Sequence, residues 1–247
     1  MRRRKFLIAS GAAIISPPAL ASGAREVLSG DAFRQGEEEF RFADILSPSL
    51  AAAAGKPPPF AYEARDILAG LARNIVAIED AAPKDRWGRR VIRATDRNGV
   101  RIEEELLKRG AARVYPETED FEVIRRLLAA ESEAREAGRG LWAIPLYRVR
   151  DAARPEDCED AVGGYHLVEG IGVGAGKGGS RVYLNFGEDY RTDVTASATS
   201  TIARRWKSAG TIDLESLGGA RLRVRGFVSP VNGPSIELTH PMQVELL

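Results

Sequence analysis

Arginines and carboxylates in the first half of the chain are the residue types with the clearest potential for chemistry. They lie in three short patterns: Ser29-Gly30-Asp31, residues 40–49 (FRFADILSPS) and residues 85–89 (DRWGR). Arginine forks match phosphoryl oxygens, and carboxylates bind hard cations. An arginine in a strand is, however, commonly a solvated or salt-bridged side chain, and residues 87–89 are compatible with a simple turn. The patterns alone leave both interpretations open.

Taken in order along the chain, these patterns resemble the staphylococcal-nuclease (thermonuclease) family. Ser29-Gly30-Asp31 is similar to the family's Asp-Gly-Asp turn, and residues 85–89 are similar to its Asp-x-Tyr-Gly-Arg turn. Residues 40–49 are similar to its Phe-Arg-Leu strand, which is followed by an aspartate and Thr-Pro-Glu. The terminal region of the family is matched by residues 106–110 (LLKRG), Val114-Tyr115 and residues 131–142 (ESEAREAGRGLW). The resemblance covers residues 24–145, and four patterns in the right order make chance an unlikely explanation.

The resemblance implies hydrolysis of DNA and RNA phosphodiesters with Ca²⁺. Such a reaction needs a hard cation that polarises the phosphate, arginines that neutralise its oxygens, and a carboxylate that activates water. By the resemblance, Arg41 and Arg89 stand at the two phosphate-binding arginines. Asp31 stands at one of the metal-binding carboxylates.

The same comparison shows that the catalytic set is damaged. Leu46 stands at the second metal-binding aspartate, and Ser49 stands at the general-base glutamate. Asp44 is the candidate substitute ligand, because a residue two positions before Leu46 lies on the same strand face, about 6–7 Å away. Tyr115 is a candidate for stacking on a base, with a half-buried barrel tyrosine as the alternative.

Two functions from different classes follow from these residues. The first is binding of nucleic acid or nucleotide phosphates, with ancestral Ca²⁺-dependent hydrolysis that is weak or lost. The alternative is a non-catalytic envelope module that binds a protein, a glycan or nucleic acid through two OB-type barrels. The arginine pair and Asp31 favour the first function, whereas Leu46 and Ser49 favour the alternative.

The N-terminus reads as an export signal. Residues 2–5 (RRRK) are basic, residues 6–15 are apolar, and Ala19-Leu20-Ala21 forms a small-x-small cleavage site. The order RRKFL also resembles a twin-arginine signal, with a plain secretory signal as the alternative. We therefore expect residues 1–21 to be removed, a periplasmic or secreted protein, and no stable membrane insertion.

Charge and composition limit the ligands. The chain has 36 basic and 35 acidic residues, and loss of four basic signal residues leaves 32 against 35, or −3. A mildly acidic protein has no global field that attracts polyanions, so any nucleic-acid binding must be weak and local. Cys158 is the only cysteine, which excludes an intramolecular disulfide. His166 and His240 lack metal-ligand spacing.

The pattern of apolar residues predicts an α+β fold in two domains. Residues 24–150 are expected to form a thermonuclease-like OB β-barrel with three helices. In it we expect strands at 37–46 and 74–80, a hairpin at 90–104 around Asn98-Gly99, a helix at 61–73, and a longer helix with Thr118 as N-cap and Gly138 as stop. Residues 47–59 (SPSLAAAAGKPPP) are expected to form a loop.

Residues 157–247 are expected to form a second small all-β OB-like barrel. The expected strands are 165–173, 181–186, 193–198, 220–228 and 235–247, with one helix at 201–207 between the third and fourth. The polar residues 151–160 are expected to be a linker. Residues 170–179 are rich in glycine, but no Ser or Thr follows Lys177, so we expect a flexible hairpin loop and not a phosphate-binding loop.

Overall fold

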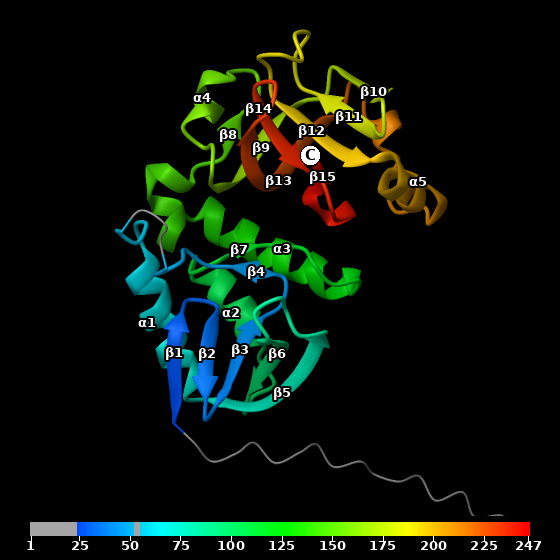
Figure 1. Cartoon of the computed structure of the whole chain (residues 1–247). Helices are drawn as coiled ribbons and strands as arrows, with labels where there is room; N and C mark the ends of the chain where they lie inside the picture. Colours follow the sequence, from blue (N-terminus) through cyan, green and yellow to red (C-terminus); the bar gives the residue numbers. More distant parts are fainter. Residues whose placement is uncertain (1–23, 52–54) are drawn as a thin grey trace, which may run out of the picture.

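The computed structural model describes residues 24–51 and 55–247, and it confirms the α+β class (Figure 1). The expected signal at residues 1–21 lies outside the described residues. Two separate hydrophobic clusters occupy the two halves of the chain. No helix in the described part is long and apolar enough to cross a membrane.

The first half is built on a five-stranded sheet with the order β1-β2-β3-β6-β5. Its strands are β1 (Arg25–Ser29), β2 (Ala32–Gln35), β3 (Glu38–Phe42), β5 (Ile75–Ala82) and β6 (Arg90–Asp96). A separate ribbon pairs β4 (Ile45–Leu46) with β7 (Arg113–Val114). Strand β3 runs parallel to β6, with Arg41 opposite Val91 and Phe42 opposite Ile92.

Three helices accompany this sheet, as the sequence predicted: α1 (Ala61–Ala72), α2 (Ile102–Lys108) and α3 (Phe121–Glu136). The N-cap of α3 is Asp120, whose side chain accepts the Val123 N–H, and not Thr118 as expected. The expected hairpin at 90–104 is also wrong beyond its turn. The chain enters α2 at Ile102, because Ile102 and Leu106 lie four positions apart and are both buried in the core.

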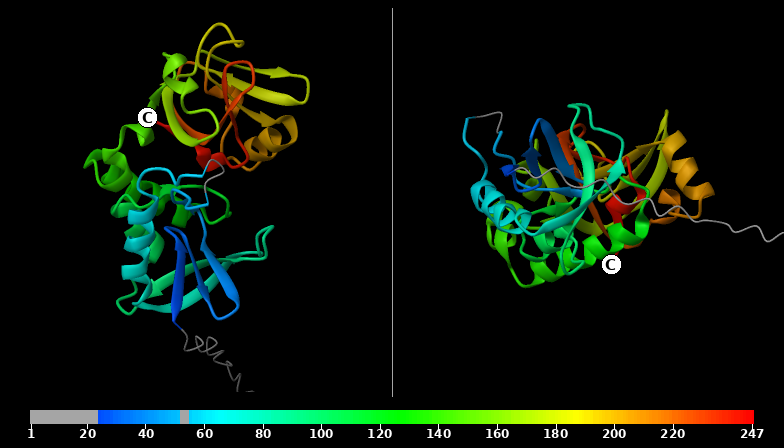
Figure 2. Two further views of the ribbon diagram at one scale, coloured as in Figure 1. Left: turned by 60° about the vertical axis from the view of Figure 1, so that its left-hand side comes forward. Right: turned by 90° about the horizontal axis from the view of Figure 1, so that it is seen from below.

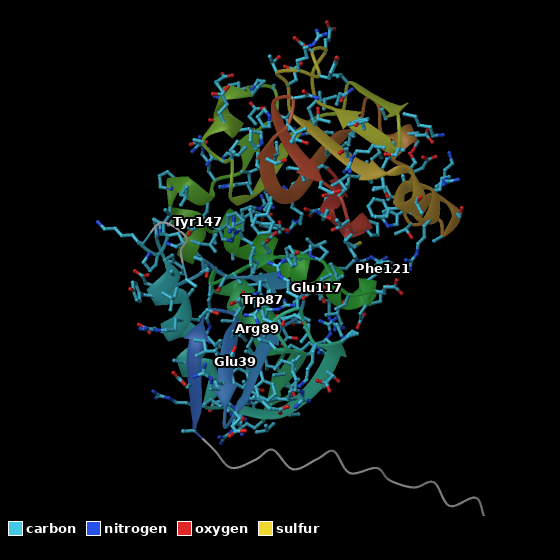
Figure 3. All side chains as sticks on the ribbon, in the orientation of Figure 1. Glu39, Trp87, Arg89, Glu117, Phe121 and Tyr147 are labelled. Carbon is cyan, nitrogen blue, oxygen red and sulfur yellow. The ribbon has the colours of Figure 1, made fainter. Side chains whose placement is uncertain are left out.

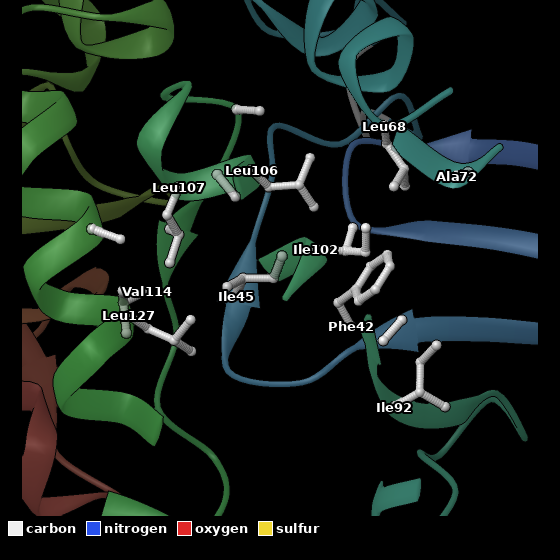
Figure 4. Close-up of a cluster of buried hydrophobic side chains, with 14 of the residues drawn as sticks. Phe42, Ile45, Leu68, Ala72, Ile92, Ile102, Leu106, Leu107, Val114 and Leu127 are labelled. Atoms are coloured by element: carbon white, nitrogen blue, oxygen red, sulfur yellow. The ribbon is translucent and has the colours of Figure 1, made fainter. Parts of the chain in front are cut away.

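The core of the first half lies between the sheet and the helices (Figure 4). Phe42 and Ile92 come from neighbouring strands, Leu68 comes from α1, and Leu106 comes from α2; all four are fully buried. At the turn between β1 and β2, position 30 has no room for a side chain, so it needs glycine. A Cβ at this position would lie 2.6 Å from the Ala64 Cβ and 2.8 Å from the Ser47 Cβ.

The second half holds a larger sheet with the order β10-β11-β12-β14-β13-β9-β8, to which β15 is added by pairing with β13. Its strands are β8 (Arg150–Asp151), β9 (Tyr165–Ile171), β10 (Gly174–Gly178), β11 (Arg181–Asn185), β12 (Thr195–Thr199), β13 (Arg221–Pro230), β14 (Pro234–Glu237) and β15 (Val244–Leu246). Helix α5 (Ser200–Ser208) lies between β12 and β13, where the sequence predicted the single helix.

Three expectations for this half need correction. The strand pairings of the described residues form open paths and not closed barrels. The second half is not all-β, because it also holds α4 (Glu156–Glu159), so the expected linker at 151–160 is partly structured and buries Cys158. Residues 174–178 are a paired strand and not a flexible loop, because glycine can still donate and accept ladder hydrogen bonds.

The two halves lie against each other (Figure 2), and their junction includes buried charge. Arg225 of β13 lies 2.8 Å from Glu131 of α3 and 2.5 Å from Glu245, and both Arg225 and Glu131 are buried. Tyr165 of β9 donates its hydroxyl to the Val114 carbonyl at 2.8 Å, and Arg113 donates to the Tyr165 carbonyl. The first half is therefore held against the second through α3 and β7.

Candidate phosphate-binding site

Arg41 and Arg89 come together although they are far apart in sequence. Arg41 pairs in register with Val91 across the parallel strands β3 and β6, and Arg89 immediately precedes β6. One oxygen of Asp85, Oδ2, accepts a hydrogen bond from Arg89 Nε at 2.8 Å and lies 3.6 Å from Arg41 Nε. The two guanidinium groups therefore approach the same carboxylate, which lies between them.

The turn at residues 85–89 holds this carboxylate in place. Asp85 Oδ1 accepts the N–H groups of Trp87 and Arg89, each at 3.0 Å, and Gly88 adopts φ 81°, which favours glycine. Burial would raise the pKa of the Asp85 carboxyl, but the hydrogen bonds from Arg89 and from the backbone lower it. Asp85 therefore stays charged and orients Arg89.

Trp87 projects from the same turn into solvent, with 65% of its surface exposed. The guanidinium carbons of Arg86 and Arg89 lie 3.9 and 5.0 Å from its ring centroid. An exposed indole flanked by cations is a surface on which a nucleobase can stack. Trp87 was missed from the sequence, although its position between Arg86 and Arg89 indicates such a surface.

Glu117 is the main partner of Arg41, and sequence reasoning missed it. Arg41 donates from Nη1 to Glu117 Oε1 at 2.7 Å and from Nη2 to Oε2 at 2.8 Å, a bidentate pair. Burial would lower the pKa of Arg41, but Glu117, Asp31 and Asp85 together raise it. Three carboxylates therefore compete with any phosphate for this guanidinium.

Asp44 holds the segment that carries Glu117. It is fully buried at φ 60° in the turn between β3 and β4, so it does not share a regular strand face with Leu46 as expected. Its Oδ1 accepts the N–H groups of Glu117 and Thr118, each at 2.9 Å. Its Oδ2 accepts from the Thr118 hydroxyl at 2.7 Å and from Arg93 at 2.9 Å.

The residues at the expected metal positions do not fit a calcium site. Asp31 is buried, and its two oxygens accept from the Ser29 hydroxyl at 2.6 Å and from the Ser47 N–H at 3.0 Å. Leu46 offers no oxygen, and the exposed Ser49 hydroxyl accepts the Ala51 N–H at 3.2 Å. Calcium takes about six to eight oxygen ligands. Within residues 24–51 and 55–247, no group of three or more His, Cys, Asp or Glu side chains is placed to hold a metal.

Tyr115 lies in an aromatic cluster at the junction of the two halves. Its ring packs edge-on against Tyr165 at 5.6 Å and Phe227 at 6.4 Å, and it is partly buried. This environment matches the alternative of a half-buried tyrosine. The two histidines also serve packing: His240 Nε2 bonds the Thr118 carbonyl at 2.9 Å, and burial lowers the pKa of His166 to about 3.

A shallow hollow of about 220 Å³ adjoins Arg89. Trp87, Lys84 and Arg90 line one part of it, and residues 37–39 (EEE) line another. Figure 3 marks Trp87, Arg89 and Glu117 on the first half of the molecule. Arg41 and Asp31 do not line this hollow.

The segment that contains these residues is similar to known proteins. Residues 39–144 match the family model described as Staphylococcal nuclease homologue. The chain is also 28% identical over 171 residues to Staphylococcal nuclease domain-containing protein 1 of Drosophila melanogaster. That alignment covers 59% of this chain but only 18% of the relative, so the chain spans less than a fifth of that protein. Residues 39–144, which hold Arg41, Asp85, Arg89 and Glu117, are therefore the part of the chain that is similar to the staphylococcal nuclease homologue family.

Proposed function

We propose that the first half of the chain binds nucleic acid or nucleotide phosphates, and that it cleaves them weakly or not at all. The observation that carries this proposal is the approach of Arg41 and Arg89 to one oxygen of Asp85, at 3.6 and 2.8 Å, beside the exposed Trp87. Two guanidinium groups that approach the same anionic oxygen can both donate to one phosphate group, and the base attached to that phosphate can stack on the indole.

Binding requires an exchange of anions at Arg41. In the structure Nη1 and Nη2 of Arg41 both donate to Glu117, and the bound phosphate takes over these two donors. Because one anion replaces another, much of the attraction is offset. This exchange, together with the net charge of −3 expected after removal of residues 1–21, supports weak and salt-sensitive binding.

Weak or absent hydrolysis follows from the residues that would have to catalyse it. Ser49 cannot accept a proton from water near neutral pH, and loss of a general base costs about 10²–10⁴ in rate. Leu46 cannot ligate a cation, and Asp44 is committed to Thr118 and Arg93. No step through calcium is therefore assigned to these residues.

Titration calorimetry with thymidine 3′,5′-bisphosphate tests the binding. We expect Arg41→Ala to weaken it about 10- to 100-fold, the equivalent of about 1–3 kcal/mol for hydrogen bonds to a charged group. Arg34→Ala is the matched control, because Arg34 on the adjacent strand also pairs with two carboxylates, Glu26 and Glu39. Equal affinities of the two variants would leave Arg41 as an ordinary salt-bridged residue.

We also propose that the protein is exported through its first 21 residues, on the basis of the basic, apolar and small-residue pattern. N-terminal sequencing of protein from fractionated cells should then give a chain that begins near Ser22. Replacement of Arg3 and Arg4 by lysine should block export by a twin-arginine route and leave a plain secretory route nearly unaffected. A periplasmic or secreted chain that still begins at Met1 would contradict cleavage.

A further inference from the structure

A second concave surface lies on the second half of the chain, in the region of β10, β11, β12 and β14. It is a groove of about 580 Å³, within the range of about 300–1,000 Å³ typical of ligand sites. The candidate phosphate-binding site contributes no residue to it. Any ligand of this groove would therefore bind separately from a phosphate at Arg41 and Arg89.

The floor of the groove is a regular polar surface made by the strand register. Tyr183 of β11 stands opposite Ser197 of β12, which stands opposite Glu237 of β14. The next row has the same order with Asn185, Thr195 and Ser235. The alternate residues of the strands, such as Val182, Leu184 and Ala196, point into the hydrophobic core.

Strand β10 leaves one side of this floor open. Gly174, Gly176 and Gly178 lie at every second position, opposite Asn185, Tyr183 and Arg181, so these three residues of β10 add no side chain to the groove face. A Cβ on Gly176 would meet no atom within 4 Å. The glycine-rich sequence thus makes room for a ligand beside the Tyr183 ring.

The cations of the groove are already neutralised. Arg181 donates from Nη2 to Glu237 Oε1 at 3.0 Å and from Nε to the Ser197 hydroxyl at 3.1 Å. Lys177, which also lines the groove, lies 3.3 Å from Glu215. A polyanion would have to displace these carboxylates, whereas an uncharged ligand leaves both pairs intact. The charge balance therefore argues against a nucleic acid and in favour of a neutral ligand.

The remaining lining groups match a sugar chain. The half-buried side chains of Asn185 and Ser235 can exchange hydrogen bonds with sugar hydroxyls, and the buried Thr195 and Ser197 complete the polar floor. Tyr183 lies on the floor, and Tyr190, with 51% of its surface exposed, also lines the groove, so two aromatic faces are available to the apolar faces of pyranose rings. We propose that this groove binds a neutral oligosaccharide.

Binding of the full chain to an array of neutral, sialylated and sulfated glycans tests the proposal, followed by calorimetry with the best neutral oligosaccharide. We expect Gly176→Leu to weaken binding at least about tenfold, because the new side chain occupies the groove. Gly70→Leu is the matched control, since Gly70 also has open space around its Cβ position but lies in α1. Thermal unfolding of both variants checks that each one keeps the fold.

Tyr183→Ala gives an independent measurement. It should weaken binding about three- to tenfold through loss of one stacking ring, whereas Tyr62→Ala, at an exposed tyrosine of α1, should leave the affinity unchanged. Absence of any neutral glycan on the array would overturn the proposal. Salt-sensitive binding of a short oligothymidylate that Gly176→Leu abolishes would overturn it in favour of a nucleic-acid groove.

Discussion

Replacement of Glu117 by glutamine changes the charge that a phosphate meets at Arg41 and leaves the shape of the side chain nearly unchanged. The Glu117 backbone N–H still donates to Asp44 Oδ1 at 2.9 Å, so the segment keeps its position. The substitution removes the negative charge of the carboxylate that accepts two hydrogen bonds from Arg41, at 2.7 and 2.8 Å. The variant therefore isolates the competition between a carboxylate and a phosphate for one guanidinium.

The size of the effect follows from the burial of the pair. Hydrogen bonds to charged groups contribute about 1.5–3 kcal/mol. The Arg41 and Glu117 side chains are 13% and 23% exposed, so solvent screens part of this. Because glutamine keeps one neutral hydrogen bond, we take about 1 kcal/mol as the difference. Glu117→Gln should then bind thymidine 3′,5′-bisphosphate about fivefold more tightly than the natural protein.

Calorimetry at two salt concentrations, with Glu119→Gln as control, checks this expectation. Glu119 lies two residues further along and is 80% exposed, and its partner is Arg205 and not Arg41. The control removes the same charge at nearly the same place, so it reports the general electrostatic change. Equal gains in the two variants would refute a specific competition at Arg41. Weaker binding by Glu117→Gln would mean that Glu117 orients the ligand.

Three other outcomes are expected. The double variant Leu46→Asp with Ser49→Glu should gain measurable Ca²⁺-dependent cleavage of single-stranded DNA, and each single variant should gain less, because metal and base act as a unit; a folded but inert double variant would show that the surrounding site has also diverged. Burial raises the pKa of Glu103 to about 7 in the folded protein, above the value of about 4.5 in the unfolded chain. Protonated Glu103 therefore stabilises the fold below pH 4.5, and this part of the unfolding free energy should be lost as the pH rises to 7. The unfolding free energy of Glu103→Gln, measured in urea, should not fall over this pH range. Arg225→Ala should cost about 3–5 kcal/mol of unfolding free energy by leaving a buried carboxylate unpaired, whereas the exposed Arg221→Ala should cost less than about 1 kcal/mol.

The sequence was a good guide wherever a local pattern determines the structure. The turn at residues 85–89 contains its own hydrogen-bond acceptor, Asp85, and the glycine that its backbone requires. The alternation of Val182 and Leu184 with polar residues gave β11, and helix α5 was found at its expected place. The approach of Arg41 and Arg89 was predicted only because the resemblance placed both of them in one family site.

The misses share a physical cause, which is dependence on contacts between distant residues. Nothing near Glu117 in the sequence indicates that it binds Arg41, 76 positions away. Asp44 suggested a metal ligand because a strand was assumed through it, whereas its positive φ turns the chain and points its oxygens at Thr118. Residues 174–178 suggested a loop because glycine has low strand propensity, but pairing with β11 outweighs that preference.

The buried charge at the junction of the two halves has a consequence for anyone who divides this chain. A fragment that ends at residue 150 would expose Glu131 without Arg225, and it would leave Val114 without the hydroxyl of Tyr165. The segment around Glu117 would also lose the His240 contact to the Thr118 carbonyl. Truncation would therefore alter the surroundings of Arg41 although every residue of the candidate site remains. Measurements on an excised nuclease-like fragment would therefore report on a site whose surroundings differ from those in the full chain.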